Sequence, residues 1–272
     1  MSKVKVGIIG GTGLDDPQLL LSKTEIDVDT PYGKPSSLLT VGELNGVPVV
    51  LISRHGKNHS IAPSQINYRA NIWALKEIGC THILATNACG SLKENYKIGD
   101  LIILDQFIDR TFKRENTFYS GLPNDLPGVQ HIPMGEPFCE YTRNVLIEAT
   151  KTCGFDMHER GNIVIIEGPR FSTRAESKMF QLWGGDLVGM TTVPEVCLAK
   201  EVGISYSSIA MVTDYDAWRD GDHVTVEQVA KVMHENAEKA KNVLLTAITL
   251  IGKQNWDEVI EKNNLCSRMA VM

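Results

Sequence analysis

The 272-residue sequence contains no pair of cysteines in a CxxC spacing. This absence excludes the common structural zinc motifs and the dithiol motif of disulfide exchange. The six cysteines stand far apart, mostly within apolar stretches, at Cys80, Cys89, Cys139, Cys153, Cys197 and Cys266. Isolated thiols of this kind are typical of proteins that are kept in a reducing compartment. The sequence therefore predicts reduced thiols and a cytoplasmic location, with the nucleus as a further compartment.

Positive charge is also scarce. The chain has 27 Lys and Arg against 33 Asp and Glu, a net charge of −6, and its basic residues form no cluster. Nucleic-acid surfaces need a basic patch, so this balance argues against a nucleic-acid partner. The longest late apolar run, residues 243–251, is too short to cross a bilayer, and no apolar leader precedes residue 4. We expect neither nucleic acid nor membrane as a partner.

The glycine-rich run "VGIIGGTGLDD", residues 6–16, lacks the spacing of a nucleotide-cofactor loop. Asp16 stands where the dinucleotide fingerprint needs its third glycine, and no Gly-Lys-Ser/Thr follows, as a P-loop would require. What remains is a turn after a strand, whose backbone N–H groups and Thr12 hydroxyl could cradle free phosphate. The alternative is a tight turn that needs glycine only for a positive φ. We therefore expect no organic cofactor at this loop.

Strands and helices alternate along the chain. Apolar β-branched runs predict strands at residues 3–9, 81–86, 100–105, 163–166, 186–189 and 204–213, and a hairpin that turns at Asn45-Gly46. Apolar residues at helical spacing predict helices at 63–79, 138–154, 173–183, 192–203 and 226–251. This pattern predicts a three-layer α/β fold, in which helices flank a central mixed, mainly parallel β-sheet. No linker or repeat interrupts the pattern, so we expect a single domain over residues 1–272.

Ligands of such folds bind beyond the carboxyl ends of the strands. Arg54 and His55, in "SRHG", follow the second hairpin strand, and the guanidinium fork of Arg54 could bind phosphate. Asn87 and Ala88, in "NACGS", are expected in a loop of small residues that lets a ligand approach the backbone. Thr191, in "GMTTVPEV", precedes a helix whose N-terminus attracts anions. The first two motifs have structural alternatives, namely a surface Arg-His pair and simple close packing.

Two further loops carry groups suited to a planar base. In "EGPRFS", Phe171 could stack on the base, and Ser172 could bond it or simply cap the next helix. In "VTDYD", Asp214 and Asp216 are two residues apart, so in an extended chain both carboxylates face the same side. A metal is disfavoured because no His or Cys stands at ligand spacing. The pair could instead serve a purine, one acid sharing a proton with N7 and the other accepting from an exocyclic amine.

Six stretches, "GIIGGTGL", "RHG", "NACGS", "EGPRFSTRAE", "MTTVPEV" and "TDYD", occur in this order. The chain thereby resembles the trimeric purine nucleoside phosphorylase family from about residue 3 to about residue 251, and within it the branch that uses 5′-methylthioadenosine. The resemblance implies phosphorolysis, in which inorganic phosphate attacks C1′ and releases adenine and 5-methylthioribose 1-phosphate. Adenosine and 2′-deoxyadenosine would be further substrates. It also implies the nucleoside phosphorylase fold, a homotrimer, and neither organic cofactor nor metal.

The motifs carry the family's site residues onto this sequence. The resemblance implies phosphate binding by Thr12, Arg54, His55, Asn87, Ala88 and Thr191. It implies nucleoside binding by Met190 under the ribose, Phe171 and Ser172 at the base, Asp214, Tyr215 and Asp216 at N7 and N6, and Val226, Val229 and His59 around the 5′ group. His131 would reach a neighbouring subunit's site. Asp214 would be the catalytic acid, with a pKa raised by burial and by Asp216, because a proton at N7 answers the charge that develops on the base.

Three other functions remain open. The branch that acts on 6-oxopurine nucleosides carries Asn-Lys in place of Asp-Tyr-Asp, yet Asn87 resembles that branch, since a threonine is usual there among methylthioadenosine enzymes. A non-catalytic purine-binding module would bind the nucleoside without converting it. A nicotinamide-dependent reductase would need Glu25 or Asp27 on a ribose, but the glycine spacing disfavours it. The C-terminal stretch "NNLCSRMAVM" matches the family poorly.

Overall fold

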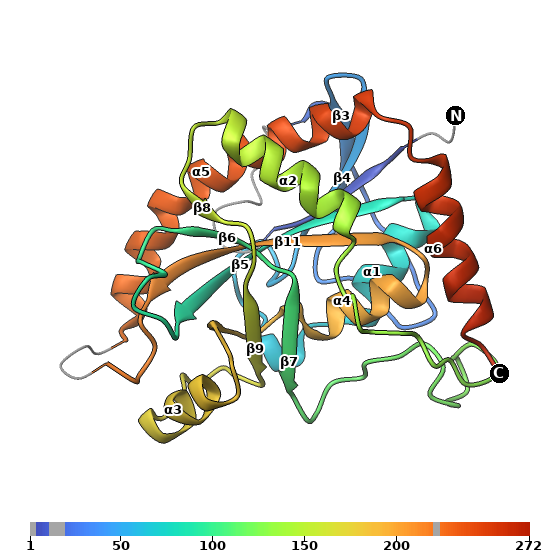
Figure 1. Cartoon of the computed structure of the whole chain (residues 1–272). Helices are drawn as coiled ribbons and strands as arrows, with labels where there is room; N and C mark the ends of the chain where they lie inside the picture. The colour runs from blue at the N-terminus through green and yellow to red at the C-terminus, as the bar shows by residue number, and fades with distance from the viewer. Residues whose placement is uncertain (1–3, 11–19, 220–223) are drawn as a thin grey trace.

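The computed structural model describes residues 4–10, 20–219 and 224–272. A mixed β-sheet forms its centre, and helices lie on both faces of the sheet (Figure 1). The described strands are β1 (Val6–Gly10), β2 (Leu21–Ile26), β3 (Leu39–Leu44), β4 (Val47–Ser53), β5 (His82–Ser91), β6 (Leu101–Ile103), β7 (Gln106–Arg110), β8 (Met157–His158), β9 (Asn162–Ile166), β10 (Leu187–Gly189) and β11 (Ser205–Asp214). The described helices are α1 (Tyr68–Glu77), α2 (Glu140–Thr152), α3 (Arg174–Leu182), α4 (Thr192–Glu201), α5 (Val226–Lys253) and α6 (Asp257–Met269). Among these helices, none has both the length and the apolar character needed to cross a membrane.

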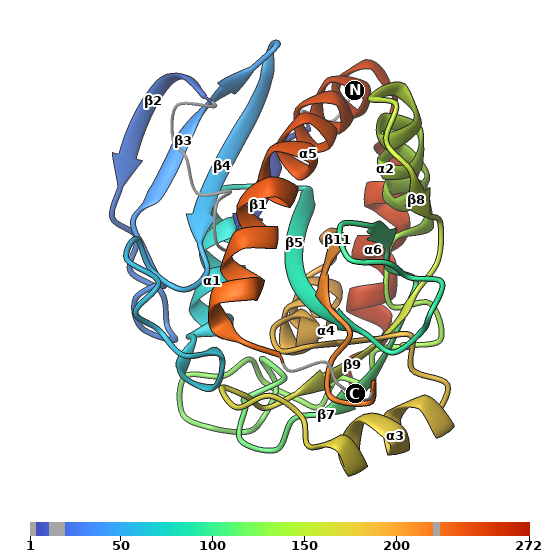
Figure 2. The same ribbon diagram turned by 90° about the vertical axis from the view of Figure 1, so that its left-hand side faces the viewer.

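The strands follow the order β2-β3-β4-β1-β5-β10-β9-β7, and β11 pairs with β5 and β6 away from this path. Strand β5 is central, since β1, β10 and β11 all pair with it. The pairings of β1 with β4 and β5, of β11 with β5, and of β9 with β7 and β10 are parallel, whereas β2, β3 and β4 form an antiparallel group. Figure 2 shows this group at the left edge of the molecule. The predicted mixed, mainly parallel sheet is confirmed.

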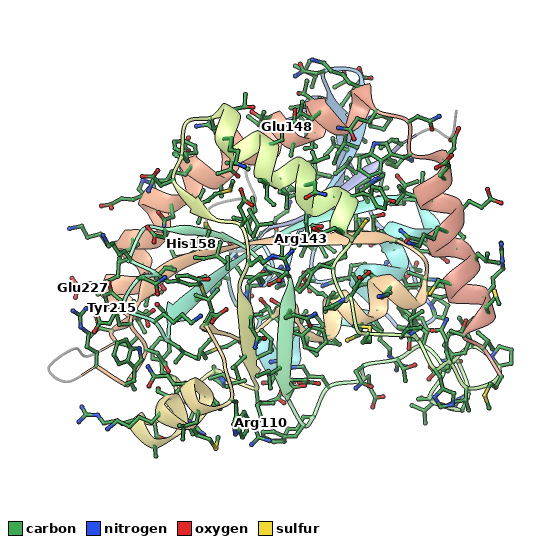
Figure 3. The ribbon with its side chains drawn as sticks, viewed as in Figure 1. Arg110, Arg143, Glu148, His158, Tyr215 and Glu227 are labelled. Atoms are coloured by element: carbon green, nitrogen blue, oxygen red, sulfur yellow. The ribbon has the colours of Figure 1, made fainter. Side chains whose placement is uncertain are left out.

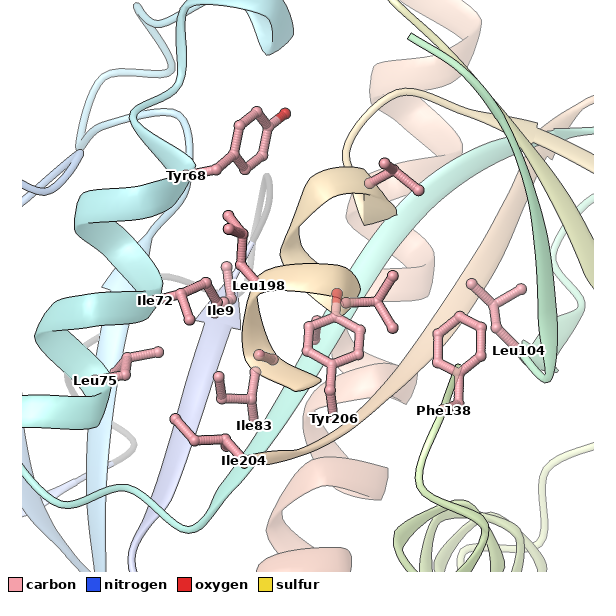
Figure 4. Close-up of a cluster of buried hydrophobic side chains, with 14 of the residues drawn as sticks. Ile9, Tyr68, Ile72, Leu75, Ile83, Leu104, Phe138, Leu198, Ile204 and Tyr206 are labelled. Atoms are coloured by element: carbon pink, nitrogen blue, oxygen red, sulfur yellow. The ribbon is translucent and has the colours of Figure 1, made fainter. Parts of the chain in front are cut away.

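Neighbouring residues of the central strands pack into opposite layers. Ile8 of β1 and Leu84 of β5 belong to a cluster with apolar residues of α2 and α5. Ile9 and Ile83, one position away, belong to a second cluster with residues of α1 and α4, and Figure 4 shows Leu75 of α1 in this cluster. A sheet that is buried on both faces reads as continuous apolar runs, which is how these strands appear in the sequence. The three-layer prediction is thereby confirmed.

The stretch "NACGS" is part of strand β5, so its prediction as a loop is wrong. β11 pairs with β5 as far as Gly90, and β10 pairs with it at Gly90 and Ser91, which keeps the backbone extended. Glycine is needed for this approach, because a Cβ on Gly90 would lie 2.8 Å from Oδ1 of Asp214. Asn87 and Ala88 therefore lie on a rigid central strand beside β11.

Four elements, β2, β7, β8 and α6, have no counterpart in the predictions from the sequence. Helix α6 contains no fully buried residue, and Val259 and Ile260, which pack against the core, are only partly buried. The helix expected at 63–79 is shorter in the structure. A 3₁₀ turn at Pro63–Gln65 comes first, and α1 begins after Asn67, whose Oδ1 accepts the backbone N–H of Ala70 at 3.2 Å. This cap explains where α1 begins.

Candidate active site

A cavity of about 330 Å³ lies where residues of β5, β10 and β11 meet the segment after β4 and the first turns of α5. This is the edge of the sheet at which an α/β fold binds its ligands. Most of the residues predicted for the site line it: Arg54, His55, His59, Asn87, Ala88, Phe171, Ser172, Met190, Thr191, Asp214, Asp216, Val226 and Val229.

Among the described residues, two predicted ones, Tyr215 and His131, are not part of this lining. Thr12 lies outside the described residues. Tyr215 packs its ring edge-on against Trp218 at 6.2 Å, and Figure 3 shows Tyr215 near the start of α5, at the outside of the molecule. His131 is exposed, and its backbone N–H donates to the carbonyl oxygen of Ala270 at 2.8 Å. The roles of all three stay predictions.

Arg54, directly after β4, is buried with only 1 % of its surface exposed. Its Nε and Nη2 donate to the two carboxylate oxygens of Glu195 at 2.5 and 3.0 Å, and its Nη1 donates to the carbonyl of Thr86 at 2.9 Å. The Tyr206 hydroxyl donates to the same carboxylate at 2.8 Å. Burial alone would lower the pKa of Arg54, but Glu195 more than offsets this and holds it above the usual value. Nε and one N–H of Nη2 are thus engaged by Glu195, and one N–H of Nη1 by Thr86. The second N–H of each terminal nitrogen remains available for an anion.

Asn87 connects β5 to the start of α4. Its Nδ2 donates to Oγ1 of Thr191 at 2.7 Å, and Ser208 of β11 donates to its Oδ1. The Thr191 hydroxyl accepts that bond and keeps its own proton to donate. Oγ1 of Thr86, which also lines the cavity, is buried without a hydrogen-bond partner among the described residues. Arg54, Thr86, Asn87 and Thr191, which we call the anion end, form a donor-rich group suited to an oxyanion.

His55 lies beside this group and has a fixed tautomer. Its Nδ1 is 2.8 Å from the carbonyl oxygen of Ile61, and because a carbonyl only accepts, Nδ1 carries the proton. Burial lowers the pKa of His55 to about 4, and the charges of Arg54 and His59, whose ring is 4.3 Å away, act in the same direction. His55 is therefore neutral at pH 7. Its Nε2 can accept a hydrogen bond from a hydroxyl or a protonated phosphate oxygen, but the ring adds no positive charge.

Asp214 and Asp216, which we call the acid end, are held by neutral donors. Thr213 donates its hydroxyl to Oδ2 of Asp214 at 2.7 Å, and the backbone N–H of Asp216 donates to Oδ1 at 2.8 Å. Asp216 is 4 % exposed and accepts a bond from the Ser177 hydroxyl. Burial raises the pKa of both carboxyls against these hydrogen bonds, and the charge of Asp214 raises that of Asp216 further. A raised pKa lets a carboxyl carry a proton closer to neutral pH.

The chain between these carboxylates is not extended, so that step of the sequence argument is wrong. Strand β11 ends at Asp214, and Asp216 has a φ of +49°. A positive φ is tolerated better by Asp than by most residues. The two side chains reach one cavity through this turn, and not through the alternation of a strand. The expected contribution of Asp216 to the pKa of Asp214 also differs, because its backbone N–H lowers that pKa. In the described part of the chain, no group of three or more His, Cys, Asp or Glu is arranged to hold a metal ion.

The first turns of α5 form an apolar wall of the cavity. Val226, Val229, Ala230 and Met233 line it; Val226 is 75 % exposed, whereas Met233 is only 4 % exposed. This wall offers a ligand no hydrogen-bonding side chain, so it suits a short apolar substituent. We call these four residues the apolar end.

Two buried residues that hold the site, Glu195 and Arg114, are missing from the sequence predictions. Glu195 is paired with Arg54 across 141 residues, and Arg114 reaches the carbonyl oxygen of Met190 across 76 residues. Partners so distant leave no local pattern. The one available signal was the acidic residue itself, because Glu is almost never fully buried unless it is paired, and Glu195 stands in the apolar stretch "TTVPEV".

Known proteins are similar to this chain in sequence and in fold. The phosphorylase superfamily matches residues 5–249. The S-methyl-5′-thioadenosine phosphorylase of Xenopus tropicalis is 58 % identical over 271 residues, which are 99 % of this chain and 96 % of the relative. That of Danio rerio is 57 % identical over 272 residues, covering 100 % and 97 % of the two chains. Methylthioadenosine phosphorylase from Schistosoma mansoni, solved in complex with adenine, is 48 % identical with a TM-score of 0.96 over 99 % of both chains. This chain therefore belongs to the phosphorylase superfamily, in the family of the S-methyl-5′-thioadenosine phosphorylases.

Proposed function

We propose that this chain catalyses the phosphorolysis of S-methyl-5′-thioadenosine to adenine and 5-methylthioribose 1-phosphate. The observation that carries the proposal is a single cavity that joins the anion end, the acid end and the apolar end. Phosphate, the purine and the methylthio group would each occupy the end that matches its chemistry. The names of relatives that are 58 % and 57 % identical over nearly the whole chain support the same substrate.

The reaction breaks the bond between C1′ and N9 and forms a bond between C1′ and a phosphate oxygen. Positive charge develops on the sugar and negative charge on the base. Phosphate at Arg54, Thr86 and Thr191 would stabilise the sugar and attack C1′. Asp214, whose pKa burial raises, would hold a proton at N7 and so stabilise the leaving base.

Asp216 would select adenine. An ionised carboxylate only accepts hydrogen bonds, so it suits the N6 amine and repels a 6-oxo group. Burial and the charge of Asp214 raise the pKa of Asp216, and the Ser177 hydroxyl acts against them. An N6 amine that donates to Asp216 would favour the ionised form further. Phe171 and Ser172 would lie on the base.

The remaining predicted residues complete the proposal. Met190 would lie under the ribose and Tyr215 near the base, while Thr12, His55, Asn87 and Ala88 would serve phosphate, and Val226, Val229 and His59 the 5′ group. We further propose one domain over residues 1–272, a homotrimer in which His131 reaches a neighbouring site, and a cytoplasmic or nuclear location. No organic cofactor takes part in this scheme.

Adenosine is proposed as a second substrate. The Schistosoma mansoni relative solved as a variant with methylthioadenosine is named adenosine/methylthioadenosine phosphorylase, and it is 48 % identical to this chain. Val226, at the mouth of the apolar end, is exposed, so a 5′ hydroxyl placed there would stay in contact with water. We expect adenosine and 2′-deoxyadenosine to be converted with lower kcat/KM than methylthioadenosine.

The test incubates the purified protein with methylthioadenosine, adenosine and inosine, each with and without phosphate, and measures the free base by chromatography. We expect adenine to appear from methylthioadenosine only when phosphate is present. Adenine release without phosphate would contradict the proposal. Inosine as the best substrate would assign the chain to 6-oxopurines, and binding without conversion would make it a purine-binding module.

A further inference from the structure

Arg114 does not line the cavity, yet its guanidinium donates to the backbone of two segments that do. Its side chain is 2 % exposed. Nη1 donates to the carbonyl oxygens of Met190 and Val193, both at 2.6 Å, and Nη2 donates to the carbonyl oxygen of Glu167 at 2.7 Å. One flat, charged group thus ties the connection between β10 and α4 to the chain that leaves β9.

A second set of contacts fixes the guanidinium itself. Nε donates to Oε1 of Glu167 at 3.1 Å, and Nη1 also reaches the Tyr68 hydroxyl at 3.1 Å. Burial alone would raise the pKa of Glu167, but the backbone N–H of Phe112 and the Arg114 side chain hold it below its usual value. The ionised Glu167 balances the Arg114 charge, which would otherwise be costly to bury. The guanidinium is therefore held in one place and one plane.

The two tied segments carry cavity residues on both sides of Arg114. Met190 and Thr191 lie in one, and Phe171 and Ser172 follow Glu167 in the other. They also touch directly, because a Cβ on Gly168 would lie 2.6 Å from the sulfur of Met190. The spacing between the segments therefore sets the width of the cavity at this point.

We infer that Arg114 is a positioning residue for the nucleoside, because its fork sets the spacing between segment 190–193 and segment 167–172. This inference rests on the proposed function, in which Met190 contacts the ribose and Phe171 the base. The phosphate ligands have anchors of their own: Glu195 holds Arg54, and Ser208 holds Asn87. Thr191 lies on segment 190–193, but its hydroxyl is held separately by Nδ2 of Asn87 at 2.7 Å. Loss of Arg114 therefore weakens nucleoside binding more than phosphate binding.

The experiment compares Arg114→Met and Arg114→Lys with a matched control, Arg143→Met. Arg143 is also buried and donates to backbone carbonyls, those of Leu104 and Glu159, but it belongs to α2 and does not line the cavity (Figure 3). In Arg114→Met we expect the KM for methylthioadenosine to rise about ten-fold or more, since a small misplacement of a binding group is costly. The KM for phosphate is expected to stay within about two-fold. A lysine keeps the charge but not the fork, so Arg114→Lys gives an intermediate value.

An unchanged nucleoside KM in folded Arg114→Met overturns the inference. An equal rise of the KM for methylthioadenosine and the KM for phosphate in Arg114→Met also overturns it. So does a rise of the methylthioadenosine KM alone in Arg143→Met, because the effect would then not be specific to Arg114. If Arg114→Met does not fold, Arg114→Lys and Tyr68→Phe, which removes one acceptor of Arg114, decide by the same KM split. Wild-type protein that fails to convert methylthioadenosine refutes the proposed function. If the wild-type protein is active and Arg114→Lys has the same KM for methylthioadenosine as the wild type, only the positioning role of Arg114 is refuted.

Discussion

The anion end and the acid end of the cavity bury charge in opposite ways. At the anion end, Arg54 is matched by Glu195, and the pKa of Arg54 is held up so that its charge is permanent. At the acid end, the described partners of Asp214 and Asp216 are hydroxyl and backbone N–H groups, and burial raises both pKa values. The charge of Arg54 is balanced by Glu195 before a ligand arrives, whereas Asp214 and Asp216 gain a proton or a further partner only with the ligand.

This difference matches what each end would do in phosphorolysis. A fixed positive charge binds a fixed negative charge, so the anion end needs no change during the reaction. The acid end must hold a proton while the base leaves, and a carboxyl does so only if its pKa is raised. The predictions below change one end at a time, from the largest expected effect to the smallest.

Replacement of Asp214 by asparagine removes the proton donor from the acid end. We expect kcat for methylthioadenosine to fall on the order of 10²–10⁴, as is typical when a general acid is lost. Wild-type activity is also expected to fall as the pH rises through the raised pKa of Asp214, because the proton is then lost. Steady-state kinetics between pH 5 and 9 measure both effects. Asp100→Asn, at a carboxylate that binds His158 outside the cavity, is the control, and a similar kcat in the two variants would contradict the role of Asp214.

Glu195→Gln removes the negative charge that balances Arg54 at the anion end. An unpaired buried charge costs about 3–5 kcal/mol, so we expect a loss of that size in the free energy of unfolding. The KM for phosphate is expected to rise as well, since Arg54 is no longer fixed. Denaturant unfolding and phosphate kinetics provide the measurements. Tyr206→Phe, which removes only one neutral donor to Glu195, is expected to cost about 1 kcal/mol. Equal losses in both variants would show that the ion pair is not what holds this end.

Which site residues can be predicted from the sequence depends on how far apart along the chain the interacting residues are. Arg54, Asn87 and Asp214 were predicted because each stands where a parallel strand ends or approaches its neighbour, and such positions have local motifs. Glu195 and Arg114 were missed because their partners are 141 and 76 residues away. Tertiary contacts of this kind leave no periodic signal in the sequence.

The fold shows the same division. The buried strands and the long helix α5 follow from apolar runs and helical spacing. The edge strand β7 is only partly buried, and α6 has no buried residue, so neither carries the pattern that marks a core element. The continuation of β5 through "NACGS" depends on pairing with β11 and β10, which small polar residues do not reveal.

His55 tests whether the ring that lies beside the anion end stays neutral. Its pKa is about 4 in the folded chain against about 6.5 when unfolded, so between these values only the unfolded chain binds the proton. Stability is therefore expected to fall as the pH drops from about 6.5 towards 4, by up to about 1.4 kcal/mol per pH unit. Unfolding by urea at several pH values measures how the free energy of unfolding changes with pH. In His55→Gln we expect this slope to be smaller, by the amount that corresponds to one proton taken up on unfolding. The buried His82 also has a pKa of about 4, so it makes an equal contribution to the pH dependence of stability, and this contribution remains in His55→Gln. A slope that His55→Gln leaves unchanged would mean that His55 is charged at the anion end.

The apolar end sharpens the comparison because it holds the substrate without any charge. Val229→Thr keeps the side-chain volume but adds a hydroxyl to this wall. We expect the preference for methylthioadenosine over adenosine, measured as a ratio of kcat/KM values, to fall about ten-fold, the scale of one small group in an apolar pocket. Val232→Thr, half-buried on the same helix but outside the cavity lining, is the control and should leave the ratio unchanged. The KM for phosphate should be the same in all three proteins, since the anion end keeps its own anchors. A ratio that survives Val229→Thr would mean that selectivity for the 5′ group lies outside this wall.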